Sequence, residues 1–154
     1  MGNKASVRTT IALMNISLRE ARIEDRAELQ GFLADYLFEF DGRTGPYPEL
    51  DSYWTDSERI PFFVTVDGNP VGVCLIRTRD GGWSIAEFWV KPSHRRGGVG
   101  RAAVEAFVER ARDADAQHLE AKIHPDNGSA FLFWSAIGFE EISNEGVLVT
   151  RRQL

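Results

Sequence analysis

A basic, glycine-dense stretch follows a mostly apolar run near the middle of this 154-residue chain. The apolar run covers Ile85–Val90, and Lys91–Arg101 then holds four Lys or Arg side chains and three glycines before a helical pattern begins. The first N–H groups of a helix have no partners within the helix, and the helix dipole is positive there. Because glycine lets a ligand approach the main chain closely, this stretch predicts a phosphate-binding site.

Composition restricts the kind of ligand that could bind there. The formal net charge is -5, so nonspecific binding to nucleic acid, which needs a basic surface, is not expected. No apolar run approaches the roughly 18 residues of a membrane span, so no membrane partner is expected either. The one cysteine, Cys74, lies in an apolar strand pattern. A buried thiol is therefore expected rather than a nucleophile, and this favours a reducing, cytoplasmic location.

Hydrophobic periodicity indicates the elements that must position the site. A strand at Ile16–Arg19 precedes an amphipathic helix from about Glu24 to Phe40, and a short second helix is expected between Glu49 and Ser57. Three strands joined by tight turns then form an antiparallel meander, namely Pro61–Val66, Val71–Arg77 and Trp83–Val90. We expect residues 1–14 to be a disordered leader and residues 15–154 to form one domain.

The second half of the chain predicts a crossover between two parallel strands. An apolar helical stripe follows the glycine-rich turn, and alternation of Leu119, Ala121 and Ile123 indicates a strand after it. A further helix is expected from about Asn127 to Ile137, followed by a hairpin.

Two motifs in this order of elements resemble the GNAT N-acetyltransferase superfamily. Arg95-Arg96-Gly97-Gly98-Val99-Gly100 fits the acetyl-CoA signature of Arg or Gln, two residues, Gly, one residue, then Gly or Ala. Asn127–Ala130, Phe133-Trp134 and Gly138-Phe139 follow at the spacing of the second motif. The resemblance implies an α/β (α+β-like) GNAT fold, with a mixed, mostly antiparallel sheet of about six to seven strands flanked by about four helices. It also implies direct acetyl transfer from acetyl-CoA to a primary amine of a small molecule or a protein, without an acyl-enzyme.

The resemblance implies where acetyl-CoA binds. The pyrophosphate would lie on N–H groups from Arg95 to Gly100, and the pantetheine arm would run like an extra strand along Phe88–Val90. A bulge in this strand would free an N–H to stabilise the oxyanion, which is worth about 2.7–4 kcal/mol per donor. The cofactor contacts expected in this way are Phe88, Trp89, Val90, Arg95, Arg96, Gly97, Gly98, Val99, Gly100, Arg101, Asn127, Ala130, Phe133 and Trp134. No metal is expected.

Transfer of this kind needs a neutral amine, so a general base must accept a proton. Glu87, in the strand before the glycine-rich turn, is the first candidate, and a solvated or salt-bridged strand residue is the alternative interpretation. Glu120 and His124 share one face of the next strand and are the second candidates. His124 precedes a proline, so a plain strand-end residue is its alternative role.

The acid that protonates the leaving thiolate is less clear from the residues. The superfamily frequently has a tyrosine where Trp134 stands, and an indole N–H cannot replace its hydroxyl. A thiol with a pKa near 8.5 is a tolerable leaving group, so water or Tyr36 could serve. Core packing is the alternative role for Phe133 and Trp134.

The segment between the first helix and the meander would form the wall of the acceptor pocket by resemblance. Tyr36, Glu39 and Trp54 are our candidate contacts. Residues 35–58 hold seven carboxylates against one base, Arg43, which suggests a cationic amine such as a polyamine, an amino sugar or a lysine-like group. A solvated acidic face over an aromatic core is the alternative.

Two other functions compete with catalysis by a GNAT enzyme. Gly98–Ala103 also fits the glycine pattern of dinucleotide-binding folds. That pattern opens a parallel strand–helix–strand unit directly after its first strand, whereas here hairpins join the preceding strands and four residues intervene after Lys91-Pro92. A non-catalytic acyl-CoA-binding or sensor module of the same fold stays open because of Trp134. The last hairpin could also provide an edge for a homodimer.

Overall fold

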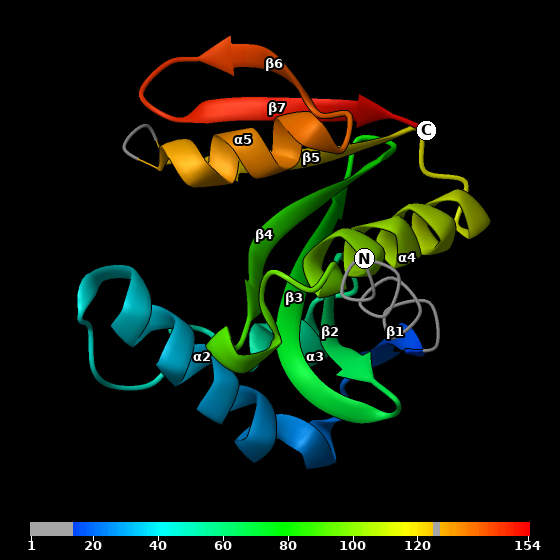
Figure 1. Ribbon diagram of the computed structural model, residues 1–154. Helices are drawn as coiled ribbons and strands as arrows, with labels where there is room; N and C mark the ends of the chain where they lie inside the picture. Colours follow the sequence, from blue (N-terminus) through cyan, green and yellow to red (C-terminus); the bar gives the residue numbers. More distant parts are fainter. Residues whose placement is uncertain (1–13, 125–126) are drawn as a thin grey trace, which may run out of the picture.

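A seven-stranded sheet with helices on both faces organises the computed structural model, which describes residues 14–124 and 127–154 (Figure 1). The expected leader, residues 1–14, lies outside the described residues except for Met14. In chain order the elements are β1 (Ile16–Glu20), α2 (Arg26–Asp41), α3 (Ser52–Thr55), β2 (Arg59–Val66), β3 (Asn69–Arg79), β4 (Gly82–Val90), α4 (Val99–Asp113), β5 (His118–Ile123), α5 (Gly128–Ala136), β6 (Glu140–Asn144) and β7 (Leu148–Gln153). Single 3-10 turns at Ile23–Asp25 and Pro92–His94 precede α2 and the glycine-rich turn.

The strand order confirms the predicted fold class. The sheet runs β1-β2-β3-β4-β5-β7-β6, and among the described strands only β4 and β5 pair in parallel, as the strand–helix–strand crossover predicted. The helix expected between Glu49 and Ser57 is shorter than predicted. It is the single turn Ser52–Thr55, because Glu49 has a left-handed φ of 57° and Asp56 is extended.

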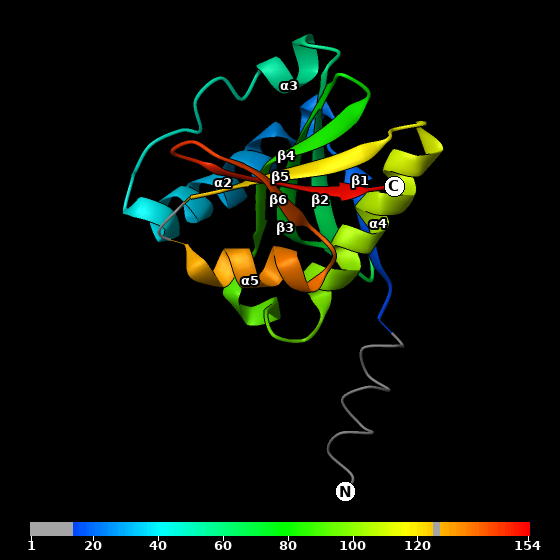
Figure 2. The same cartoon turned by 90° about the horizontal axis from the view of Figure 1, so that it is seen from above.

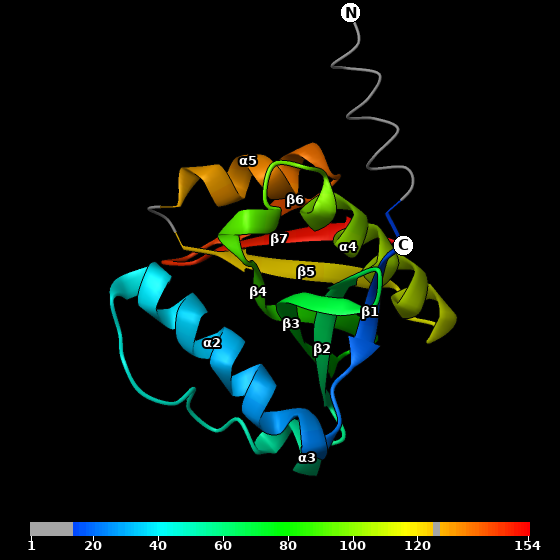
Figure 3. The ribbon, with the colours of Figure 1, turned by 60° about the horizontal axis from the view of Figure 1, so that its bottom comes forward.

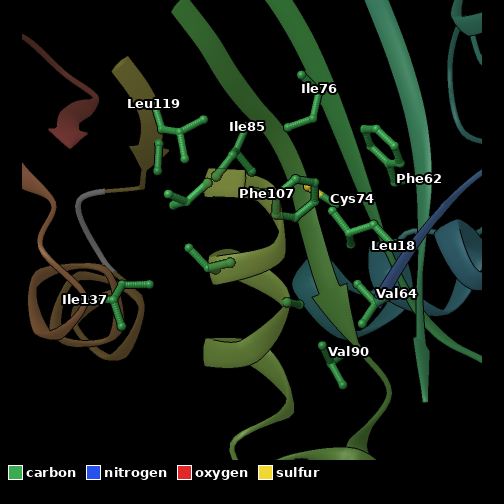
Figure 4. Packing of buried hydrophobic residues seen from close by; sticks show 14 of the residues in the cluster. Leu18, Phe62, Val64, Cys74, Ile76, Ile85, Val90, Phe107, Leu119 and Ile137 are labelled. Atoms are coloured by element: carbon green, nitrogen blue, oxygen red, sulfur yellow. The ribbon is translucent and has the colours of Figure 1, made fainter. Parts of the chain in front are cut away.

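Each face of the sheet has its own apolar core. Helices α4 and α5 cover one face, and α2 and α3 cover the other (Figures 2 and 3). The ring of Phe107 in α4 packs against the ring of Phe62 in β2, with centroids 5.8 Å apart. Figure 4 shows both side chains in this apolar core. Cys74 belongs to this core as a buried free thiol, and burial raises its pKa.

The parallel pair separates along its length, and this positions the site. Ile85 and Ala121 are the last paired residues of β4 and β5, after which the strands diverge (Figure 1). Between β3 and β4 the register shifts, so that Ala86 forms a bulge opposite no residue of β3. The last five residues of β4 therefore have no strand partner on the β5 side within the described chain.

Strand β6 is the edge of the sheet on the C-terminal side, and all five of its residues are exposed. The homodimer edge expected at this hairpin stays a prediction. None of the helices within the described ranges is long and apolar enough to cross a membrane.

Candidate active site

Two clefts meet where β4 and β5 separate. One cleft, of about 510 Å³, lies against the glycine-rich turn and is here called the turn cleft. The other, of about 430 Å³, lies between α2, the loop after it and the ends of β4 and β5, and is called the carboxylate cleft because Glu87 lines it. Phe88, Asn127, Ala130 and Trp134 line both clefts. A molecule in one cleft therefore touches the same wall as a molecule in the other.

Backbone conformation shapes the turn cleft. Arg96 and Gly98 have left-handed φ values of 63° and 85°, and Gly98 is the N-cap of α4. This conformation favours glycine at Gly98, and the 15-residue helix that follows leaves its first N–H groups unpaired. The turn thus has the geometry of an anion cradle.

Twelve of the fourteen residues predicted to contact the cofactor line this cleft, and they are Phe88, Trp89, Val90, Arg95, Arg96, Gly98, Gly100, Arg101, Asn127, Ala130, Phe133 and Trp134. Val99 is buried in the core under the turn, and Gly97 lies beside open space. The indole ring of Trp89 packs against Phe32 of α2 at a centroid distance of 6.2 Å. His94 and Ser129, which were not predicted as contacts, also line the cleft.

Arg95 fastens the turn to the rest of the protein. Its Nε donates to the carbonyl oxygen of Val90 at 2.8 Å, and its guanidinium lies 5.8 Å from the Trp89 ring centroid. The same guanidinium forms an ion pair with Glu39 at 2.7 Å. Glu39, predicted as an acceptor contact, therefore holds the turn instead.

Aromatic rings form the wall between the clefts. Phe88 stacks on Phe133 with centroids 6.2 Å apart, and Trp134 meets the edge of Phe88 at 5.6 Å. Trp134 is only 7% exposed and also packs on Phe139 at 5.0 Å, so it belongs to the core as well as to the wall. Asn127 caps α5, since its Oδ1 accepts from the N–H of Ala130 at 3.1 Å.

Glu87 is half-buried in the carboxylate cleft between two tyrosines. The hydroxyl of Tyr47 donates to its Oε1 at 3.1 Å, and Tyr36 also lines this cleft. Burial raises the pKa of Glu87 above its ordinary value, while its contacts with Tyr36 and Tyr47 and the charge of Arg43 oppose the rise. Burial and the nearby carboxylate likewise raise the pKa of both tyrosines. The raised pKa makes Glu87 a stronger proton acceptor than an exposed glutamate.

Comparison with known families identifies the chain. A model of the acetyltransferase (GNAT) family matches residues 25–139, a range that contains the glycine-rich turn, Glu87 and α5. The chain belongs to the GNAT acetyltransferase family. A search of curated proteins finds no significant match.

Solved structures share the fold of this GNAT protein. The PaiA N-acetyltransferase of Thermoplasma acidophilum, solved with coenzyme A, superposes with a TM-score of 0.69 and 12% identity, over 91% of this chain and 99% of its own. The ribosomal-protein-S18-alanine N-acetyltransferase of Escherichia coli gives 0.68 and 16%, over 90% and 94%. The GNAT domain of S. lividans PAT gives 0.72 and 18%, over 89% of both chains. At these low identities the superpositions show a common fold alone.

The other predicted site residues of this GNAT protein lie in different places. His124 lines the carboxylate cleft beside Phe40, with the two rings 6.4 Å apart. Glu120 points into a separate cleft and is held there by Arg151, whose Nε donates to it at 3.1 Å. Trp54 lies in α3, where its Nε1 donates to the carbonyl oxygen of Ala21 at 3.0 Å. Glu120 and Trp54 therefore do not join the carboxylate cleft.

Three residues with polar or charged side chains line the carboxylate cleft but were not predicted as site residues, namely Arg43, Tyr47 and Lys122. Tyr47 and Arg43 belong to the loop after α2, whose path across the sheet has no periodic signal. Lys122 shares the strand face of His124, so the same period of two could have indicated it.

The raised pKa of Glu87 predicts that the stability of the folded protein depends on pH. Below the unfolded-state pKa, near 4.3, the carboxyl is protonated whether the chain is folded or not. As the pH rises through the higher folded-state pKa, the folded protein must ionise a half-buried group and loses stability. We therefore expect Glu87→Gln to raise Tm relative to the parent protein at pH 8, with the difference shrinking toward pH 4. Thermal melts of both proteins across this range measure it, and a difference that is constant with pH would contradict it.

Proposed function

We propose that this GNAT protein transfers an acetyl group from acetyl-CoA directly to a primary amine of a small molecule or a protein. The observation that carries the proposal is the junction of the two clefts at Phe88 and Trp134, with the half-buried Glu87 on the far side of that junction from the glycine-rich turn. One cleft suits an anionic, extended donor, and the other offers a proton acceptor to the amine.

The turn cleft fits coenzyme A on its own features. The first N–H groups of α4 and the left-handed Gly98 would hold the pyrophosphate, with Arg96 and Arg101 adding positive charge beside it. The unpaired side of β4 beyond the Ala86 bulge would hydrogen-bond the pantetheine arm as a neighbouring strand would. When bound, acetyl-CoA supplies an activated thioester carbonyl.

Glu87 accepts a proton from the amine in this proposal. An amine with a pKa near 10.4 is almost wholly protonated at neutral pH, so it loses one proton to Glu87 before or as it attacks. The amine nitrogen forms a bond to the carbonyl carbon and gives up a second proton to solvent, the carbon–sulfur bond breaks, and the thiolate takes up a proton from solvent. The products are the acetamide and the free thiol. Tyr47 holds the Glu87 carboxylate through its hydrogen bond.

The proton for the thiolate comes from solvent rather than from a tyrosine. Tyr36 and Tyr47 both have pKa values raised above the ordinary value of 10, so they give up a proton less readily. Trp134 has no acidic proton to give. A thiol with a pKa near 8.5 leaves without assistance from a strong acid, so the reaction does not depend on a tyrosine at this position.

Thiol release tests the proposed function. The purified chain is incubated with acetyl-CoA and a panel of amines, and free thiol is followed with a chromogenic disulfide. We expect amine-dependent release, with the acetylated amine found by mass spectrometry in equal amount. Tight binding of CoA without release for any amine would instead support the non-catalytic sensor that Trp134 leaves open.

A further inference from the structure

A third cleft, of about 370 Å³, lies next to the carboxylate cleft on the same face of the sheet. We call it the basic cleft, because Arg77, Arg79, Lys122 and Arg151 line it together with His118, against the two carboxylates Asp80 and Glu120. Lys122 lines both the basic cleft and the carboxylate cleft. The two clefts are therefore neighbours that share one cationic side chain.

Strand register explains why these side chains gather. Arg77 pairs with Ser84, Ser84 with Glu120, and Glu120 with Arg151, so one row crosses β3, β4, β5 and β7. Directly opposed residues share a face, and Lys122 lies on that face two positions along β5 from Glu120. Glu87 also lies on this face, because it pairs with Leu75, which packs under α2 and α3.

Only part of the positive charge in the basic cleft is compensated. Arg151 is paired with Glu120, and the Nε of Arg77 is buried without a hydrogen-bond partner within the described chain. Lys122 and Arg79 have no ion-pair partner among the described residues. In a protein with a net charge of -5, this local excess of cations attracts an anion.

The acidic segment that suggested a cationic acceptor does not supply a negative cleft. Four of its carboxylates are engaged by arginines, in the pairs Glu39–Arg95, Asp41–Arg43, Asp51–Arg26 and Asp56–Arg59. Among the described residues of the carboxylate cleft, Glu87 is the one carboxylate, and the cations Arg43 and Lys122 line the same cleft. When Glu87 serves as the general base, no other carboxylate of this cleft remains to bind a fixed positive charge on the acceptor.

We infer that the acceptor is an amine that also carries an oxyanion, a carboxylate or a phosphate, and that Lys122, Arg77 and Arg79 bind this oxyanion while the amine faces Glu87. The inference rests on the proposed function, because it assigns the amine to Glu87. Glu87 and Ser84, at the centre of the basic row, pair with Leu75 and Arg77, which are two positions apart in β3, and a strand rises about 3.3 Å per residue, so their backbones are roughly 7 Å apart. The amine and the oxyanion are thus separated by several bonds.

Matched acceptor pairs test the inference. The thiol-release rate is measured with 6-aminohexanoate against hexylamine, and with glucosamine 6-phosphate against glucosamine, so that each pair differs in the oxyanion. We expect kcat/KM to favour the anionic member of at least one pair by about tenfold or more, and high salt to reduce the preference. The pair that shows it identifies carboxylate or phosphate as the group.

Charge-removal variants locate the effect. Lys122 and Arg79 are exposed, so K122Q and R79Q change surface charge without opening the core. We expect each to lower the preference for the anionic acceptor, about tenfold for K122Q. R112Q makes the same charge change at the C-terminal end of α4, which packs on the opposite face. It should leave the preference as it is in the parent protein.

The possible outcomes distinguish a failure of this inference about the acceptor from a failure of the proposed transferase function. Equal or faster acetylation of hexylamine and glucosamine would overturn the inference while confirming the transferase. If no amine is acetylated although CoA binds, the transferase fails, and calorimetry of the CoA complex then decides the inference. Tighter binding of 6-aminohexanoate than of hexylamine, reduced in K122Q, would support it. Equal or undetectable binding of both would overturn it.

Discussion

Glu87→Gln is expected to lower kcat by about 10²–10⁴, the contribution that a positioned general base usually makes. Glutamine has the same shape, and its amide oxygen still accepts the hydrogen bond that Tyr47 donates at 3.1 Å. The change therefore removes the proton acceptor without opening a cavity. Steady-state thiol release with saturating acetyl-CoA measures kcat, and calorimetry measures CoA affinity, which should stay near that of the parent protein.

The pH profile gives this prediction a second readout. Because burial raises the pKa of Glu87, kcat/KM of the parent protein should fall on the acidic side at a pH above the usual range for glutamate. The limb should vanish in the glutamine variant. Tyr47→Phe removes a hydrogen bond that favours the ionised carboxylate, so it should move the limb to higher pH. An unchanged rate in the glutamine variant would remove Glu87 as the base and leave His124 as the next candidate in the cleft.

Gly100→Glu is expected to weaken CoA binding by at least about a hundredfold. Gly100 lies in the first turn of α4, and a Cβ there would meet the Phe133 ring at 3.5 Å and the Phe88 ring at 3.8 Å, so a side chain enters the turn cleft. Like charges about 4 Å apart repel by about 4 kcal/mol at an effective dielectric constant of 20. An acidic residue also suits a helix N-terminus, so the fold should persist.

Matched variants separate charge from bulk in this experiment. Gly100→Gln adds the same volume without charge and should bind CoA more tightly than the glutamate variant. Gly31→Glu makes the same change in α2, where a Cβ would meet nothing within 4 Å, and should bind CoA like the parent protein. Calorimetry gives the affinities and circular dichroism checks the fold. A glutamate variant that retains the affinity of the parent protein would show that the pyrophosphate lies elsewhere.

Local signals were sufficient for most of the fold. The short apolar runs of β2, β3 and β4, bounded by turn residues, and the helical stripe of α4 are each visible within a single segment of sequence. The helix between Glu49 and Ser57 is shorter than predicted, because Glu49 adopts a left-handed φ of 57° that hydrophobic periodicity does not indicate.

The lining of the turn cleft could be predicted from local sequence, whereas most of the carboxylate cleft could not. Residues of the turn cleft are close together in the sequence or belong to one short motif in α5, so the motif and its neighbours predicted the lining. Residues of the carboxylate cleft come from α2, a loop, β4 and β5, and their proximity follows from chain folding. Charge counting along residues 35–58 suggested a cationic acceptor, but ion pairs such as Glu39–Arg95 join positions 56 residues apart.

The sequence by itself determined the fold class, the family resemblance and the glycine-rich turn at the start of a helix, because each depends on residue types at short spacing. The tertiary structure alone decided which carboxylates are neutralised, that Tyr47 holds Glu87, and that Lys122 joins the carboxylate cleft to the basic cleft. These features depend on strand register and on packing between distant segments. The charge that a ligand meets is fixed by such pairings and not by the count of charges along the chain.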